Sequence, residues 1–168
     1  MSDRTASARP SEEIIRAGRF SSGEPPTGAR RRAARGADVE ETPRSVLVIE
    51  DYDDSREILV EAFRGVGLPV LEAASAEAAR CLIRDNPSIG LVVTDYTLGD
   101  GDGVSLLNEA WDQGFLDGAP AMIVTAHPSV PAPKGVMVLR KPVDPLVVLA
   151  HGQELMRASE RAPGSRDA

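Results

Sequence analysis

The stretch IGLVVTDYTLGDGDG, residues 89–103, decides the fold. Its first half is an apolar run rich in β-branched residues that ends at Asp95, and its second half alternates glycine with Asp100 and Asp102. An uninterrupted apolar run of this length is typical of a strand buried on both faces, as in a parallel sheet. The glycine-rich segment behind it predicts a loop, so Asp95 lies at the carboxyl end of that strand.

The same pattern continues on both sides of this stretch. Short apolar runs alternate with segments of helical periodicity, and Asp53 or Asp54 is placed to cap the first of these helices. Such alternation predicts an α/β fold, a doubly wound five-stranded parallel sheet with helices on both faces. The predicted strands cover residues 45–50, 68–73, 89–95, 120–126 and 135–142, and the predicted helices cover 53–67, 75–86, 103–114 and 144–159.

Composition supports one ordinary domain. The chain has 168 residues, of which 42% are hydrophobic and 4% aromatic, so Val, Leu, Ile and Ala must form the core. A net charge of −7 argues against general affinity for nucleic acid. The single cysteine excludes an intramolecular disulfide. No apolar run resembles a signal peptide or is long enough to span a membrane, so we expect a cytoplasmic protein with no membrane association.

The domain is predicted to occupy residues 45–158. Residues 1–44 contain nine Arg and seven Asp or Glu, and they are poor in large apolar residues. Such a composition predicts a disordered tail that serves as a linker or, alternatively, as a docking segment. Residues 159–168 are predicted to be a second, short disordered tail. With no segment left for a DNA-binding domain, the expected output is contact with another protein.

Polar side chains gather where the predicted strands end. In doubly wound sheets, ligands bind beyond the carboxyl ends of the strands. Three carboxylates there would repel one another unless a cation lies among them, and an all-oxygen site suits Mg²⁺. A lysine and a hydroxyl beside such carboxylates suit phosphoryl transfer. The residues at these ends are Glu50, Asp51, Asp95, Thr125 and Lys141.

The motifs that carry these residues resemble a known family. VLVIEDYDDSREIL, VVTDYTLGDGDGVSLL, IVTA and VLRKPVD are similar to the receiver domain of two-component response regulators, over roughly residues 45–158. The resemblance implies the flavodoxin-like receiver fold and a phosphoryl group donated by a histidine kinase, hybrid kinase or phosphotransfer protein. All five of the family's signature positions are present, in the expected order.

The resemblance also implies a role for each signature residue. Asp95 would be the phosphoacceptor, and Thr125 and Lys141 would bind the phosphoryl group. The bond from Lys141 to Pro142 would be a cis peptide. The implied ligands of Mg²⁺ are Glu50, Asp51, Asp95 and the backbone carbonyl of Thr97.

Two departures from the family pattern concern the signalling face. Prolines 128, 131 and 133 interrupt the segment between residues 126 and 141, where the family has its fourth helix, so we expect that helix to be missing or shortened. Val138 stands where the family often has an aromatic switch residue. His127, at a position that tunes phosphate lifetime in the family, is either such a residue or a solvated bystander.

Three functions compete. The first is a single-domain response regulator, which is not an enzyme beyond its own phosphorylation and dephosphorylation. The second is a pseudo-receiver that binds partners without phosphorylation. The third is a phosphatase with an aspartate nucleophile, although Thr97 stands where such enzymes carry a second acid. Asp100 and Asp102 suggest a calcium loop, but Val104 and Trp111 occupy its ligand positions, so both aspartates are interpreted as turn formers.

Overall fold

The computed structural model describes residues 43–161 of the chain. The predicted N-terminal tail therefore lies, except for its last two residues, outside the described part, as do residues 162–168. The last helix, α4 (Pro145–Arg161), continues three residues into the segment predicted to be a C-terminal tail.

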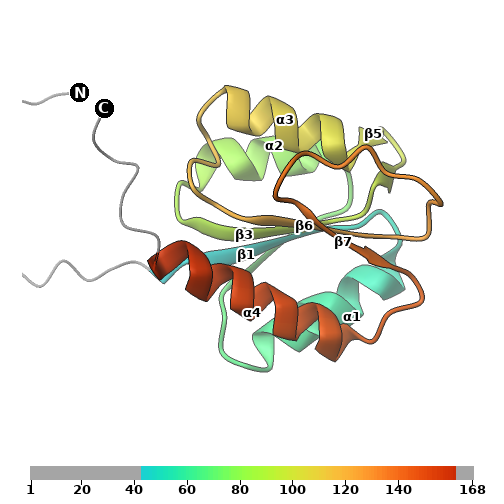
Figure 1. Ribbon diagram of the computed structural model, residues 1–168, viewed down its shortest axis with the longest axis horizontal. Helices are drawn as coiled ribbons and strands as arrows, with labels where there is room; N and C mark the ends of the chain where they lie inside the picture. The colour runs from blue at the N-terminus through green and yellow to red at the C-terminus, as the bar shows by residue number, and fades with distance from the viewer. Residues whose placement is uncertain (1–42, 162–168) are drawn as a thin grey trace, which may run out of the picture. The chain divides into compact units, whose positions relative to one another are not determined.

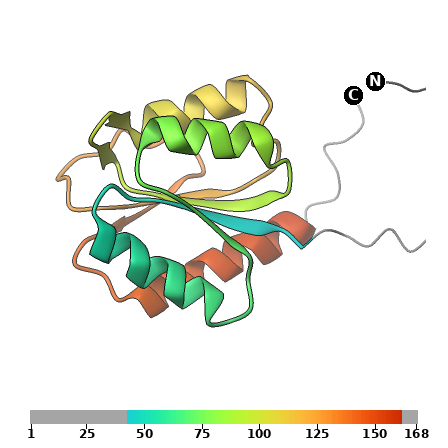
Figure 2. The same ribbon diagram turned by 180° about the vertical axis from the view of Figure 1, so that it is seen from behind.

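The centre of the fold is a sheet of five parallel strands in the order β2-β1-β3-β6-β7. Helices α2 and α3 cover one face of this sheet, and α1 and α4 cover the other (Figures 1 and 2). This arrangement confirms the predicted doubly wound α/β fold. The strands are β1 (Ser45–Ile49), β2 (Val70–Ala73), β3 (Ile89–Thr94), β6 (Ala121–Thr125) and β7 (Met137–Arg140), and the remaining helices are α1 (Asp53–Arg64), α2 (Ala76–Asp85) and α3 (Gly103–Asp112).

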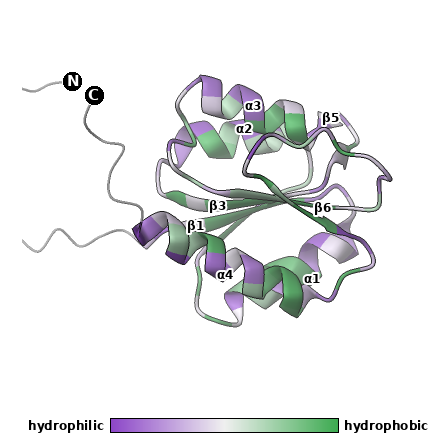
Figure 3. Cartoon of the chain, in the orientation of Figure 1, coloured by the Kyte–Doolittle hydropathy of each residue, from purple (hydrophilic) through white to green (hydrophobic). Residues whose placement is uncertain are grey.

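Alternate side chains of the central strands feed two hydrophobic clusters. In β1, Leu47 and Ile49 join the cluster beneath α2 and α3, whereas Val46 and Val48 join the one beneath α1 and α4. All four are at most 1% exposed, which explains why the strands are apolar at every position. Colouring by hydropathy shows apolar strands between helices that carry both polar and apolar residues (Figure 3).

Polar side chains cap the starts of α2 and α3, and one sequence prediction about a helix cap is wrong. The Ser75 side chain accepts a hydrogen bond from Ala78 N at the start of α2, and Asp102 accepts one from Ser105 N at the start of α3. Neither Asp53 nor Asp54 is the N-cap of α1, because Tyr52 holds that position without a side-chain cap. The two aspartates lie in the first turn instead, where their negative charge interacts favourably with the helix dipole.

Two features lie between the main elements. A hairpin of β4 (Thr97–Leu98) and β5 (Gly101–Asp102), which the sequence did not predict, follows β3 directly. Within the described residues, no helix separates β6 from β7, so the expected loss of the family's fourth helix is confirmed.

Val138 of β7 is half-buried and packs against the cluster beneath α2 and α3. None of the described helices is long and apolar enough to cross a membrane.

Candidate functional site

The strand order places the predicted site residues at one edge of the sheet. The order reverses between β1 and β3, which is the switch point where ligands of such folds bind. Ile49 pairs with Thr94 across these strands, and Asp95 N donates to Ile49 O at 2.9 Å. Glu50 directly follows β1 and Asp95 directly follows β3, so the two residues lie side by side at this edge of the sheet.

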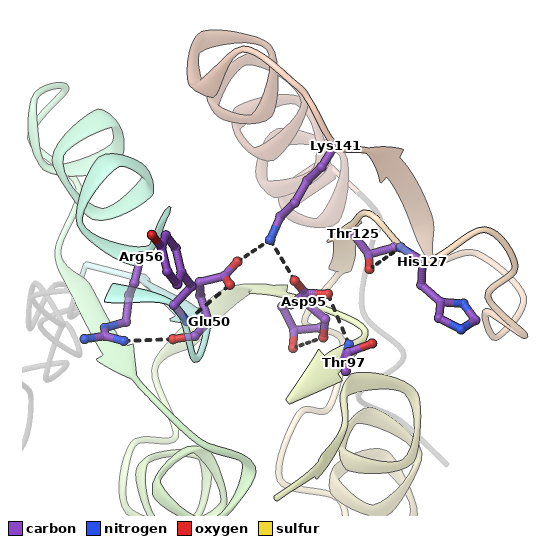
Figure 4. A network of polar contacts seen from close by, with 9 residues as sticks. Glu50, Arg56, Asp95, Thr97, Thr125, His127 and Lys141 are labelled. Carbon is purple, nitrogen blue, oxygen red and sulfur yellow. Dashed lines mark hydrogen bonds and ion pairs between the residues drawn. The ribbon is translucent and has the colours of Figure 1, made fainter. Parts of the chain in front are cut away.

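Lys141 joins the two carboxylates. Its Nζ donates to Glu50 Oε2 at 2.6 Å and to Asp95 Oδ2 at 2.7 Å (Figure 4). Hydrogen bonding of Lys141 N to Thr125 O at 2.9 Å ties the lysine's main chain to the end of β6. The peptide bond between Lys141 and Pro142 is cis, as the resemblance implied. Lys141 thus forms one ion-pair network with Glu50, which is 91 positions away in the sequence, and Asp95, which is 46 positions away.

Burial sets the electrostatics of this network. The Glu50 side chain is 3% exposed, and burial raises the pKa of its carboxyl group, an effect that the bond to Lys141 only partly offsets. Burial alone would lower the pKa of Lys141, but its hydrogen bonds to Asp95 and Glu50 outweigh that cost, and the pKa is raised. Lys141 therefore keeps its ammonium charge, whereas burial disfavours the charged form of Glu50 and the bond to Lys141 favours it.

The remaining predicted metal ligands lie at the mouth of the site. Asp51 is exposed, and its Oδ2 lies 3.7 Å from the place that a β-carbon on Gly99 would occupy, so the carboxylate faces the loop after Asp95. Thr97 N donates to Asp95 Oδ1 at 3.1 Å. Among residues 43–161, no three His, Cys, Asp or Glu side chains converge closely enough to hold a metal ion by themselves. The donors present are all oxygens, as a magnesium site requires.

Thr125 lies at the end of β6 and is 1% exposed. Its Oγ1 accepts a hydrogen bond from His127 N at 3.1 Å, which closes a tight turn after the strand. The His127 ring packs against Tyr96, with ring centroids 4.9 Å apart. Its Nδ1 lies 2.5 Å from Ser129 O. The residue directly after Asp95 thus contacts the segment that replaces the missing helix.

Two residues that sequence reasoning assigned no role in the site, or a smaller one, support its loops. Arg56 of α1 donates to the main-chain oxygen of Glu50 at 2.9 Å. Asp100 accepts hydrogen bonds from Ala76 N at 2.7 Å and Glu77 N at 2.9 Å, so it caps α2 from a distant loop. The interpretation of Asp100 as a turn former missed this cap, because a contact between segments 24 residues apart leaves no periodic signal in the sequence.

Comparison with known families identifies the family to which this fold belongs. Residues 46–145 match the model of the response regulator receiver domain, which is more than half of the chain. The chain therefore belongs to the response regulator receiver domain family. No curated protein matches the chain in sequence.

Solved structures of receiver domains resemble this one. The receiver domain of the hybrid histidine kinase CckA is 30% identical, with a TM-score of 0.60 over 67% of this chain and 98% of that chain. A CheY-like receiver domain protein from Methanospirillum hungatei is 22% identical, with a TM-score of 0.62 over 70% of this chain and 96% of that one. A receiver protein from Sinorhizobium medicae is 18% identical, with a TM-score of 0.61 over 70% and 98%. The last two likenesses concern the fold alone.

Proposed function

We propose that this receiver domain accepts a phosphoryl group on Asp95. The observation that carries the proposal is the bridge of Lys141 between Glu50 and Asp95 at the switch point of the sheet. A half-buried lysine bound to two carboxylates from different strands is a costly arrangement for stability alone, because partial desolvation of the three charges offsets much of their attraction. It suits a site in which an incoming phosphoryl group takes over one of the lysine's hydrogen bonds.

The proposed transfer is a displacement at phosphorus. An Asp95 carboxylate oxygen forms a bond to phosphorus, the bond from phosphorus to the donor's imidazole nitrogen breaks, and the leaving imidazole keeps the electron pair and takes up a proton. Lys141 stabilises the negative oxygens of the phosphoryl group, and the Thr125 hydroxyl donates to one of them. Thr97 N already holds Asp95 Oδ1 and so orients the nucleophile.

The oxygen-rich mouth of the site fits Mg²⁺. Burial raises the pKa of the Glu50 carboxyl group even with Lys141 bound to it, and a divalent cation beside it would favour the anion. When bound, Mg²⁺ would neutralise charge on the phosphoryl oxygens. The ligands we assign to it are Glu50, Asp51, Asp95 and the backbone carbonyl of Thr97.

The proposed donor is a histidine kinase, a hybrid kinase or a phosphotransfer protein, and the output is a protein-protein contact. Similarity to a receiver that belongs to a hybrid histidine kinase supports this choice of donor. A pseudo-receiver is the second candidate, favoured by the lack of a helix between β6 and β7 among the described residues. It predicts that Asp95→Asn leaves partner binding unchanged.

The test is intact-mass spectrometry of the full chain after incubation with acetyl phosphate and Mg²⁺. We expect one added phosphoryl group on the unaltered protein, and none without Mg²⁺ or in Asp95→Ala. The matched control is Asp102→Asn, which changes a nearby aspartate that caps α3 and should leave phosphorylation intact. If Asp95→Ala still gains the group, Asp95 is not the acceptor. If the unaltered chain gains none and also fails to bind Mg²⁺ and beryllofluoride, the pseudo-receiver reading replaces this proposal.

A further inference from the structure

Arg56 is a half-buried arginine that connects three separate segments. Its Nη1 donates to Glu50 O at 2.9 Å, its Nη2 donates to Asp53 Oδ1 at 2.5 Å, and its Nε lies 3.7 Å from Glu72 Oε2. The side chain is 16% exposed. The guanidinium thus joins the end of β1, the first turn of α1 and strand β2. Figure 4 shows it directed at the main chain of Glu50, on the side away from Lys141.

The oxygen that Arg56 holds belongs to the peptide bond between Glu50 and Asp51. A hydrogen bond to this carbonyl restrains the rotation of the whole peptide plane, because the peptide group is rigid. The direction in which the Asp51 side chain leaves the main chain depends on that plane. Lys141 holds the side chain of Glu50, and Arg56 restrains the peptide bond that leads to Asp51. The two basic side chains therefore act on both residues of the acidic pair.

The charge around Arg56 is compatible with a cation nearby. Asp53 and Glu72 both lie against the guanidinium, so its positive charge is offset within its own surroundings. A hydrogen bond from a charged donor is also stronger and more directional than one from a neutral group. Arg56 can therefore orient the carbonyl without adding net repulsion to a divalent ion bound at Glu50 and Asp51.

We propose that Arg56 is a positioning residue for the magnesium site, acting through the peptide bond that joins Glu50 to Asp51. The inference rests on the proposed function, because it requires that these two residues bind Mg²⁺. Arg56 does not touch the ion in this account. Partners that orient metal ligands from behind change metal affinity by about 10–100-fold when they are removed.

The experiment is titration calorimetry of Mg²⁺ into the full chain, for the unaltered protein, Arg56→Gln and Arg56→Lys. We expect Arg56→Gln to raise the Kd for Mg²⁺ about tenfold. Arg56→Lys should be weakened nearly as much, because a lysine keeps the charge but cannot donate to Glu50 O and Asp53 in the same fixed fork. If Arg56→Gln fails to fold, Arg56→Lys alone still decides the question.

The control is Arg64→Gln. Arg64 lies on the same helix and pairs with Glu72 at 3.1 Å, but it is at the end of α1 remote from the acidic pair. The Arg64→Gln variant should have a slightly lower melting temperature and an unchanged Kd for Mg²⁺. This control separates an effect on metal-ligand positioning from an effect on the stability of the fold.

The outcomes distinguish this inference from the proposed function. An unchanged Kd in Arg56→Gln, with normal binding by the unaltered chain, would overturn the role of Arg56 and leave the magnesium site standing. Full recovery of affinity in Arg56→Lys would overturn the orienting hydrogen bonds, because charge alone would then suffice. If the unaltered chain binds no Mg²⁺, the metal site itself is wrong, and this inference ends with it.

Discussion

Gly103 lies against the main chain of Asp95, the residue that we propose as the phosphoacceptor. A β-carbon at this position would collide with the Asp95 carbonyl oxygen and would lie 2.9 Å from Thr94 Cγ2. Gly103 N also donates to Tyr96 O at 2.8 Å, which closes the β4–β5 segment onto the start of α3. The glycine is therefore required by a close approach of backbone to backbone, which a side chain cannot relieve by changing rotamer.

We expect Gly103→Ala to lower the free energy of unfolding by about 1–3 kcal/mol, the usual cost of overpacking. Alanine favours helices over glycine by about 1 kcal/mol, but Gly103 is the first residue of α3, where that preference is weak, so the collision dominates. Urea denaturation measures the effect. The control is Gly101→Ala, where the nearest atom, Ala76 Cβ, is 3.5 Å away. Equal stabilities for the two variants would contradict this account.

At the scale of elements, Asp100 attaches the β4–β5 hairpin to the N-terminus of α2. Its two carboxylate oxygens accept from Ala76 N and Glu77 N, and these bonds lower the pKa of Asp100 below its ordinary value of 3.8. A carboxyl group whose pKa is lower in the folded state stabilises the fold above its ordinary pKa. That contribution is lost as the pH falls through the lowered value.

Asp100→Asn should therefore lower the melting temperature at neutral pH, because the amide keeps one acceptor oxygen but loses the charge. The difference from the unaltered chain should shrink as the pH is taken below 3.8. Thermal unfolding followed by circular dichroism across this pH range measures both quantities. A difference that stays constant with pH would show that the charge on Asp100 contributes nothing to the cap.

The elements that sequence reasoning predicted are those whose pattern is local. Runs such as 45–49 and 89–94 are buried at every position, and the periodicity of α1 and α2 is plain in the sequence. The β4–β5 hairpin was missed because strands of two residues have no periodicity. The cap on α1 was misassigned because several polar residues precede the helix, and only the backbone angles distinguish Tyr52 from its neighbours.

The candidate site was predicted as a set of strand ends, and the structure brings three of them together. Glu50, Asp95 and Lys141 form one network, as expected from parallel strands that end at the same edge. The support provided by Arg56 could not be predicted, since its partner is a carbonyl oxygen that every residue possesses. The roles of these residues in binding metal and phosphate remain predictions.

At the scale of the whole molecule, two chain segments lead from the site to the surface of the domain. One runs through Lys141 to the start of α4, and the other runs through Thr125 to residues 126–136. The second segment is built differently from that of a receiver with a helix in this place. His127 N is bound to Thr125 Oγ1, the ring of His127 contacts Tyr96, and Val130 and Val136 pack on the cluster beneath α2 and α3. A phosphoryl group that recruits the Thr125 hydroxyl as a donor would reorient this side chain, and with it the acceptor on which the turn at the start of this segment depends.

We therefore expect the response to phosphorylation to appear in residues 126–136 rather than in α4. The measurement is amide hydrogen exchange of the full chain with Mg²⁺, before and after addition of beryllofluoride as a phosphoryl mimic. Exchange should change most in the segment that contains His127 and Ser129, because its first hydrogen bond depends on Thr125 Oγ1. Thr125→Ala removes that acceptor and should abolish the change, whereas Tyr96→Leu, which keeps an apolar contact, should reduce it. A change in exchange confined to α4, with residues 126–136 unaffected, would contradict this prediction. It would mean that the conformational response passes through Lys141, and that residues 126–136 only shield the hydrophobic core.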